Sequence, residues 1–233
     1  MLRTAGSNTS KPAVVWWLIS TTETPQSLAL ALNPFRVLSR NPEQPTVHRP
    51  APGGFHHRPV LDRLDEIVAA IEDSHLKQFF VIAGCDAPTP GREYYRELAE
   101  SVPEDCVIMT TSCGKFRFND LDFDTVPRTE IPRYIDFGQC NNSISTVAVA
   151  SALADELDCG INDLPLSVVL SWFEQKAVAV LLGLLHLGVE DIYLGPTLPE
   201  FLTPTLVEHL NDAFGLRPTD EPESDLDRML ASA

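Results

Sequence analysis

The run Gln78-Phe-Phe-Val-Ile-Ala-Gly-Cys-Asp86 decides the fold class of this 233-residue chain. It is a short, continuous apolar run that ends near a glycine, a pattern typical of a strand buried on both faces of a parallel sheet. Two further runs, Cys106–Gly114 and the weaker Arg133–Cys140, predict a second and a third strand. Asp191–Gly195 predicts a fourth.

Helical patterns alternate with these strands. Apolar residues at helical spacing predict a helix over residues 60–74, and further helices are predicted over about 91–101, 142–158 and 206–214. The longest predicted helix runs from Pro165 to His186, because Asn162-Asp163 can cap it, proline suits its first position and Gly188 can end it. The alternation predicts an α/β fold with three layers and a doubly wound, mostly parallel sheet, Rossmann-like in its winding.

The composition of the chain changes along its length. Residues 1–60 hold eight of the 19 prolines, a density that breaks helices and excludes central strands. We therefore expect residues 1–58 to be irregular or poorly ordered and residues 59–217 to form the α/β domain. Residues 218–233 read as an acidic C-terminal tail in solvent, with at most one helical turn.

Charge and cysteine content exclude several classes of function. Acidic residues outnumber basic ones by 33 to 17, a formal net charge of −16, which argues against nucleic acid or an anionic membrane as the main partner. The apolar stretch Ala13–Ile19 is far shorter than the ~20 residues of a spanning helix, and it lacks the flanks of a secretory signal. Five cysteines do not suggest a disulfide framework in a chain of this size, so we expect reduced thiols in a cytoplasmic protein.

Three of the cysteines, Cys85, Cys113 and Cys140, stand at the carboxyl ends of consecutive predicted strands. Parallel strands bring their carboxyl ends to one edge of the sheet, so the three sulfurs can converge there. Doubly wound sheets bind their ligands beyond this edge. Thiolates suit iron–sulfur clusters or zinc, although the close cysteine pairs of an ordinary zinc site are absent. The alternative is that they are buried apolar residues, as free cysteines often are. Because all three stand at the same position relative to their strands, we favour ligation. For Cys106 and Cys159, core filling is the better interpretation.

Glu174 and Lys176 are the formally charged residues of the predicted helix 165–186. A charge isolated among apolar residues is costly and needs a partner. Two positions along a helix are about 200° apart, so the two side chains do not pair with each other. Glu174 can therefore reach a cation elsewhere, such as a metal, and ordinary salt bridges at the helix surface remain the alternative.

Several stretches carry a resemblance to a known family. In order along the chain, over roughly residues 75–217, the sequence resembles the C-terminal part of the hybrid-cluster proteins, also called prismane proteins or hydroxylamine reductases. The matching stretches are Ala83–Asp86, Pro90–Tyr95, Ser112–Asn119, Phe137–Asn141, Cys159–Ser167, Leu170–Ala177 and Tyr193–Thr197. The resemblance implies a prismane-type C-terminal domain over residues 59–217.

The resemblance also implies a cofactor and a reaction. The family holds a hybrid iron–sulfur–oxygen cluster (4Fe-2S-2O type) and is associated with reducing hydroxylamine to ammonia, and nitric oxide, with electrons from an external donor protein. By position, Cys85 resembles the cysteine that bears a persulfide, and Cys113, Cys140 and Glu174 resemble direct cluster ligands. Lys176 resembles a lysine that assists the reaction, so Lys176 and Glu174 are the catalytic candidates.

The departures from the family pattern concern the upstream half. In the family, a His, a Glu and a further Cys from an upstream domain complete the site, and a Cys-rich N-terminal motif holds a second iron–sulfur cluster. Residues 1–60 contain no convincing match to these groups. We therefore expect this chain to be incomplete by itself, or to need a separate chain that carries the missing half. The alternatives are a non-catalytic α/β subunit or relic, and a simple metal-binding domain built on the three cysteines.

Overall fold

A computed structural model describes residues 54, 56–85, 93–171, 175–198 and 201–232 of the chain. All of them belong to one compact unit, Thr46–Ala233. The segment 1–58, expected to be irregular, lies outside the described residues except for positions 54 and 56–58. Of these, His57 and Arg58 already belong to helix α3 (His57–Leu61).

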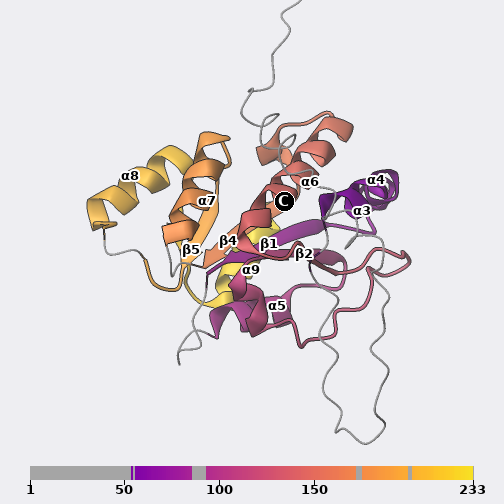
Figure 1. Ribbon diagram of the computed structural model, residues 1–233, viewed down its shortest axis with the longest axis horizontal. Helices are drawn as coiled ribbons and strands as arrows, with labels where there is room; N and C mark the ends of the chain where they lie inside the picture. Colours follow the sequence, from indigo (N-terminus) through magenta and orange to yellow (C-terminus); the bar gives the residue numbers. More distant parts are fainter. Residues whose placement is uncertain (1–53, 55, 86–92, 172–174, 199–200, 233) are drawn as a thin grey trace, which may run out of the picture. The chain divides into compact units, whose positions relative to one another are not determined.

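Within the described residues, six strands form one sheet in the order β3-β2-β1-β4-β5-β6, and every neighbouring pair is parallel. The predicted α/β, doubly wound fold is therefore confirmed (Figure 1). The chain winds outward from β1 in one direction and from β4 in the other, so the winding reverses between these two strands, where such sheets bind ligands. The strands are β1 Gln78–Gly84, β2 Cys106–Thr111, β3 Tyr134–Asp136, β4 Leu166–Ser171, β5 Ile192–Gly195 and β6 Arg217–Pro218.

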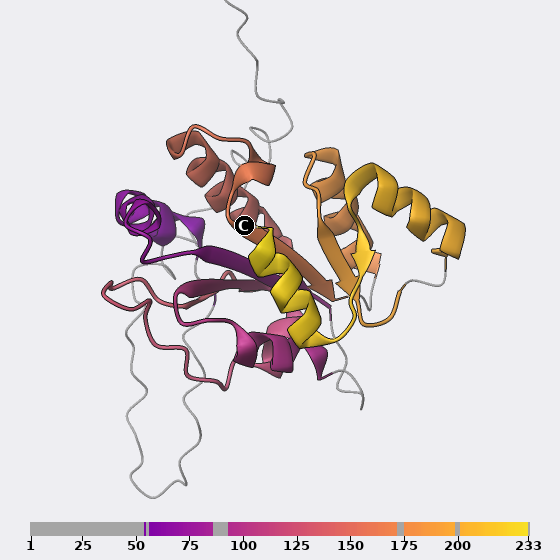
Figure 2. The same cartoon turned by 180° about the vertical axis from the view of Figure 1, so that it is seen from behind.

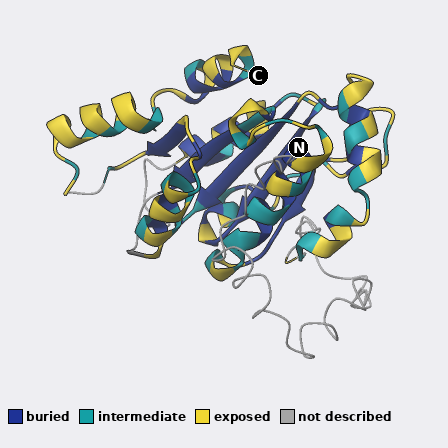
Figure 3. Cartoon of the chain, turned by 90° about the horizontal axis from the view of Figure 1, so that it is seen from above, coloured by how far each residue is buried: buried dark blue, intermediate teal, exposed yellow. Residues whose placement is uncertain are grey.

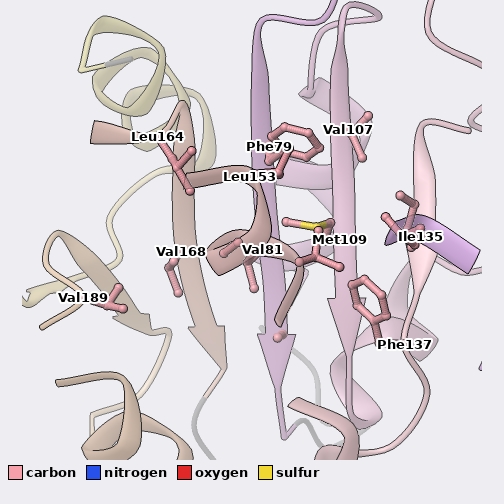
Figure 4. Close-up of a cluster of buried hydrophobic side chains, with 14 of the residues drawn as sticks. Phe79, Val81, Val107, Met109, Ile135, Phe137, Leu153, Leu164, Val168 and Val189 are labelled. Atoms are coloured by element: carbon pink, nitrogen blue, oxygen red, sulfur yellow. The ribbon is translucent and has the colours of Figure 1, made fainter. Parts of the chain in front are cut away.

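Helices cover both faces of the sheet, because successive side chains of a strand point to opposite faces. Along β1, Phe79 and Val81 join one buried cluster and Phe80 and Ile82 join another. Figure 4 shows the first cluster, and Figure 3 shows the strands buried between helices with exposed outer faces. Helices α3, α4 (Leu64–Glu72), α6 (Ser143–Glu156) and α7 (Gln175–His186) contribute to the first cluster, and α5 (Tyr94–Ser101) and α9 (Pro222–Ala231) to the second (Figure 2).

The prediction of one helix from Pro165 to His186 is wrong. Residues 166–171 form β4, the strand next to β1, and only Gln175–His186 is helical. A run that is apolar on all sides fits a buried strand as well as a buried helix, and periodicity cannot separate the two. The expected cap residues instead end a single 3-10 turn, Ile161–Asp163.

The other predicted helices are present with adjusted bounds. The helix predicted over 60–74 is two helices, α3 and α4, with a break at Asp62-Arg63. The helices predicted over 91–101 and 142–158 correspond to α5 and α6. The last one is α8 (Pro204–Phe214), which Thr203 caps and Gly215 ends in a left-handed conformation. In the described part of the chain no helix is both long enough and apolar enough to cross a bilayer.

The expectation of a solvated acidic tail is also wrong, because residues 222–231 form helix α9. Its Leu226 and Met229 are buried against the second cluster, and its Asp225 is fully buried. Tyr94 Oη donates a hydrogen bond of 2.7 Å to Asp225 Oδ2, and Arg228 donates one of 3.0 Å to Oδ1. The many acidic residues of this segment indicated a solvated tail, whereas two apolar residues among them, Leu226 and Met229, pack the helix against the protein.

We expect Tyr94→Phe to lower the free energy of unfolding by about 1–3 kcal/mol, because a buried carboxylate loses a hydrogen-bond donor. Urea unfolding measures the change. Tyr134→Phe is the matched control, since the buried Tyr134 hydroxyl has no hydrogen-bond partner among the described residues. It should leave stability nearly unchanged, and equal losses in the two variants would contradict the role given to Asp225.

Candidate functional site

A cavity lies at the carboxyl edge of the sheet, where the winding reverses. It is lined by the ends of β1, β4 and β5, by Ser112 after β2, and by residues at the starts of α6 and α7. Three of the candidate residues are among its lining residues: Cys85, Cys140 and Lys176. The cavity therefore stands where a doubly wound sheet is expected to bind its ligand.

Cys85 follows β1 directly and is held by the end of β4. The Cys85 N–H donates a hydrogen bond of 3.2 Å to the Ser171 carbonyl, and the Ser171 hydroxyl donates one to the Cys85 carbonyl. Gly84 permits this approach: its φ is +110°, and a Cβ at this position would lie 2.2 Å from the Ser171 carbonyl oxygen. Cys85 is buried, with 8% of the residue exposed.

Cys113 begins a 3-10 helix, η1 (Cys113–Arg117), and is exposed. The register pairs Ala83 with Thr111, so Cys85 and Cys113 both lie two residues beyond a paired position. The following Gly114 packs over the end of β1, because a Cβ there would lie 3.2 Å from the Gly84 carbonyl oxygen. Cys113 is not among the residues that line the cavity.

Cys140 begins a second 3-10 helix, η2 (Cys140–Asn142), and is half-buried. Two hydrogen bonds connect its loop to the end of β2. Ser112 N donates to the Gly138 carbonyl at 2.8 Å, and Thr111 Oγ1 donates to the Gln139 carbonyl at 2.8 Å. The loops that carry Cys113 and Cys140 are therefore joined by one backbone–backbone and one side chain–backbone hydrogen bond.

Glu174 lies outside the described residues, between the end of β4 at Ser171 and the start of α7 at Gln175. Lys176 is exposed and stands in the first turn of α7, on the wall of the cavity. A cation is unfavourable at this end of a helix, because the helix dipole is positive there. The position of Lys176 therefore conflicts with local helix preference, as functional residues often do.

No three His, Cys, Asp or Glu side chains within the described ranges come together as a ready metal site. The three cysteines thus share one edge of the sheet without forming a closed ligand set from the described residues alone. That their sulfurs and the Glu174 carboxylate meet at one point stays a prediction.

The remaining two cysteines lie apart from the cavity lining. Cys106 begins β2, at the opposite end of the strand from Cys113, and is fully buried. Burial, with a smaller contribution from Asp105, raises the pKa of the Cys106 thiol to about 12. Cys159 is half-buried and packs against the first cluster. Both placements fit the expected core-filling role.

We expect iodoacetamide at pH 8 to modify Cys113 and to leave Cys106 unmodified. Only the thiolate reacts, and a thiol with a pKa near 12 stays protonated at this pH. Mass spectrometry of tryptic peptides measures the two sites, and unfolding in urea should expose Cys106 to the reagent. Early modification of Cys106 in the folded protein would contradict its burial.

One buried feature of this edge was not predicted from the sequence. Lys115 Nζ lies 2.8 Å from both carboxylate oxygens of Asp136, and both side chains are largely buried. The partners are far apart in the chain, so no local pattern indicates the pair.

The fold and the cavity define the class of this protein: a doubly wound α/β protein with cysteine thiols and a lysine at the carboxyl edge of its sheet. The model of the Prismane/CO dehydrogenase family matches residues 20–227, so the chain belongs to that family. The resemblance stated from the sequence motifs is thereby confirmed.

Similar proteins agree with this assignment. A hydroxylamine reductase of Moorella thermoacetica is 52% identical over 177 residues, which cover 76% of this chain and 41% of the relative. A hydroxylamine reductase of Geobacter metallireducens is 50% identical over 177 residues, which cover 76% of this chain and 32% of the relative. The chain therefore spans about two fifths or less of the length of these relatives.

Solved structures with the same fold include carbon monoxide dehydrogenases. The Ni-free enzyme from Thermococcus sp. AM4 gives a TM-score of 0.61 at 20% identity, over 77% of this chain and 33% of that one. Carbon Monoxide Dehydrogenase IV from Carboxydothermus hydrogenoformans gives 0.62 at 15% identity, over 77% and 35%. At these identities the likeness supports the fold alone.

Proposed function

We propose that this chain is part of a cytoplasmic oxidoreductase that reduces hydroxylamine to ammonia at a hybrid iron–sulfur–oxygen cluster. The observation that carries the proposal is the cavity lined by Cys85, Cys140 and Lys176, in a chain about half identical to hydroxylamine reductases. The cavity lies where the winding of the sheet reverses, which is the ligand position of this architecture.

The residues at this edge fit one wall of an iron–sulfur site. Thiolates are the ligands that such clusters use, and Cys85, Cys113 and Cys140 follow neighbouring strands. In the proposal Cys85 carries the persulfide, while Cys113, Cys140 and Glu174 are direct ligands. Gly84 and Gly114 let the backbones that carry these cysteines approach closely.

Hydroxylamine reduction breaks the N–O bond, consumes two electrons and two protons, and yields ammonia and water. A bound cluster would supply the two electrons, and an external donor protein would then reduce the cluster again. Lys176 is the proton donor on the cavity wall: its ammonium group gives a proton to the oxygen that leaves as water. Its positive charge also attracts the electron-rich oxygen of the substrate.

The ligand set that this chain supplies is partial in the proposal. The described residues contain no closed set of three metal-binding side chains. Residues 1–60 offer no convincing match to the upstream ligands of the family, so in the proposal the remaining ligands come from a separate chain. We therefore expect the chain alone to assemble the native cluster poorly or not at all.

The test is anaerobic reconstitution with iron and sulfide, followed by EPR and by an assay of hydroxylamine-dependent oxidation of a reduced dye. Bound iron with weak turnover that rises when a chain carrying the missing ligands is added supports the proposal. Full turnover by the chain alone would contradict the partial ligand set. Stoichiometric zinc without visible absorption would favour a simple metal-binding domain, and a colourless, metal-free protein a non-catalytic relic.

A further inference from the structure

The buried pair of Lys115 and Asp136 connects the two loops that carry Cys113 and Cys140. Lys115 lies in η1, two residues after Cys113, and Asp136 is the last residue of β3. The exposed fractions of the two side chains are 12% and 6%. The pair is therefore largely buried, within a few residues of both candidate cysteines along the chain.

Hydrogen bonds around the pair reach both loops. Lys115 Nζ lies 2.8 Å from each carboxylate oxygen of Asp136 and donates a third bond of 3.1 Å to the Gly138 carbonyl. Asp136 Oδ1 accepts a further bond of 2.6 Å from Gly138 N, two residues before Cys140. A lysine ammonium has three N–H donors, and all three have acceptors here. Its position is therefore defined by two partners, the Asp136 carboxylate and the Gly138 carbonyl.

Stability alone is a weak reason for such a pair. Taking two charges out of water costs several kcal/mol per ion, and apolar replacement of a whole buried pair is often neutral or stabilising. What an apolar pair cannot supply is directional hydrogen bonding: the ammonium donates to the Gly138 carbonyl, and the carboxylate accepts from the Gly138 N–H. The orientation of the loop that carries Cys140 depends on this arrangement.

We propose that Lys115 and Asp136 are positioning residues that hold Cys113 and Cys140 at a fixed spacing. They contact no substrate; they act through the backbones of the two cysteine loops. The purpose of the spacing rests on the proposed function, since the two thiols would face one cluster. The spacing itself is a property of the chain without any metal.

The experiment measures that spacing by cross-linking in the metal-free full chain. All five cysteines are described, and Cys85 and Cys106 are buried. In a Cys159→Ser background, a short bifunctional maleimide should therefore link Cys113 to Cys140, and tryptic mass spectrometry identifies the link. A parent chain in which these two thiols do not link overturns the proposal.

Lys115→Met should slow the formation of this link by about tenfold or more, because the effective concentration of one thiol near the other falls when the loops lose their geometry. Reaction with a monofunctional maleimide should keep its rate. Lys77→Met is the matched control: it breaks a lysine–aspartate pair of 2.6 Å with Asp105, ahead of β1 and β2 at the other end of the sheet. It should leave the cross-linking rate unchanged, and an unchanged rate in Lys115→Met overturns the proposal.

Two further variants separate positioning from stability. Lys115→Met combined with Asp136→Leu should recover the urea midpoint, yet its cross-linking should stay slow. Recovery of both would show that the pair only stabilises the fold, and would overturn the proposal. Asp136→Asn keeps the shape of the side chain and an acceptor for Gly138 N, so it supplies the same test with a milder change if Lys115→Met does not fold. Because no step uses iron or turnover, the result is independent of hydroxylamine reduction.

Discussion

The Gly84→Ala variant is expected to yield no stably folded protein. A Cβ at this position would lie 2.2 Å from the carbonyl oxygen and 2.7 Å from the nitrogen of Ser171. These are backbone atoms of β4, in the centre of the sheet, and cannot move aside as a flexible side chain can. The φ of +110° adds strain for any L side chain. We expect a loss of more than about 5 kcal/mol, which is comparable with the whole stability of a typical domain.

Soluble yield, circular dichroism and urea unfolding measure this effect. Gly183→Ala is the matched control, because nothing lies within 4 Å of a Cβ there and the residue is inside α7. Alanine should stabilise that helix by about 0.5–1 kcal/mol. A folded Gly84→Ala protein with parent-like stability would show that β1 and β4 do not approach each other as closely as described.

The parts of the fold that were predicted correctly have unambiguous local patterns. The run around Val81 is short, continuous and followed by a glycine, and it forms β1. The run 166–171 has the same character, but it merges along the chain with the apolar residues of α7. Whether such a segment is strand or helix depends on its neighbour β1, which offers a free edge for pairing. That contact is long-range, so it leaves no trace in the local periodicity.

The C-terminal residues illustrate a second limit. Leu226 and Met229 are three positions apart and dock α9, while the acidic residues between and around them face elsewhere or, like Asp225, find buried partners. Asp225 is buried because Tyr94, from a distant helix, donates to it. From charge alone, an aspartate such as Asp225 is expected in solvent. The sequence therefore predicted a solvated tail at residues that form the packed helix α9.

The sequence predicts which edge of the sheet carries the candidate site, but it does not predict how the side chains are arranged there. Parallel strands fix which residues reach the carboxyl edge, and Cys85, Cys113 and Cys140 all follow strands that end there. The turns beyond the strands decide where each thiol points: one is buried, one exposed and one half-buried. Those turns depend on Ser112 and Gly138, whose φ values are +77° and +94°. A serine with positive φ has no clear sequence signal.

Lys176→Met is expected to lower the kcat of hydroxylamine reduction by about 10²–10⁴, the usual contribution of a general acid. The measurement uses the reconstituted preparation that turns over, whether the chain alone or the chain together with the partner that completes the ligands. Iron content and the EPR spectrum should stay as in the parent, because Lys176 is exposed on the cavity wall and is no ligand in the proposal. Lys77→Met, an exposed lysine at the other end of the sheet, is the control and should keep parent activity.

Lys176→Arg separates the two roles given to the ammonium group. Arginine keeps the positive charge at the start of α7 but does not release its proton at ordinary pH. If proton donation limits the reaction, Lys176→Arg should lose nearly as much kcat as Lys176→Met while KM stays close to that of the parent. If the charge alone is needed, Lys176→Arg should recover most of the activity, and the assignment of Lys176 as the proton donor would be wrong. Parent activity in both variants would remove Lys176 from the reaction altogether, and the unfavourable placement of a cation in the first turn of α7 would then need another cause.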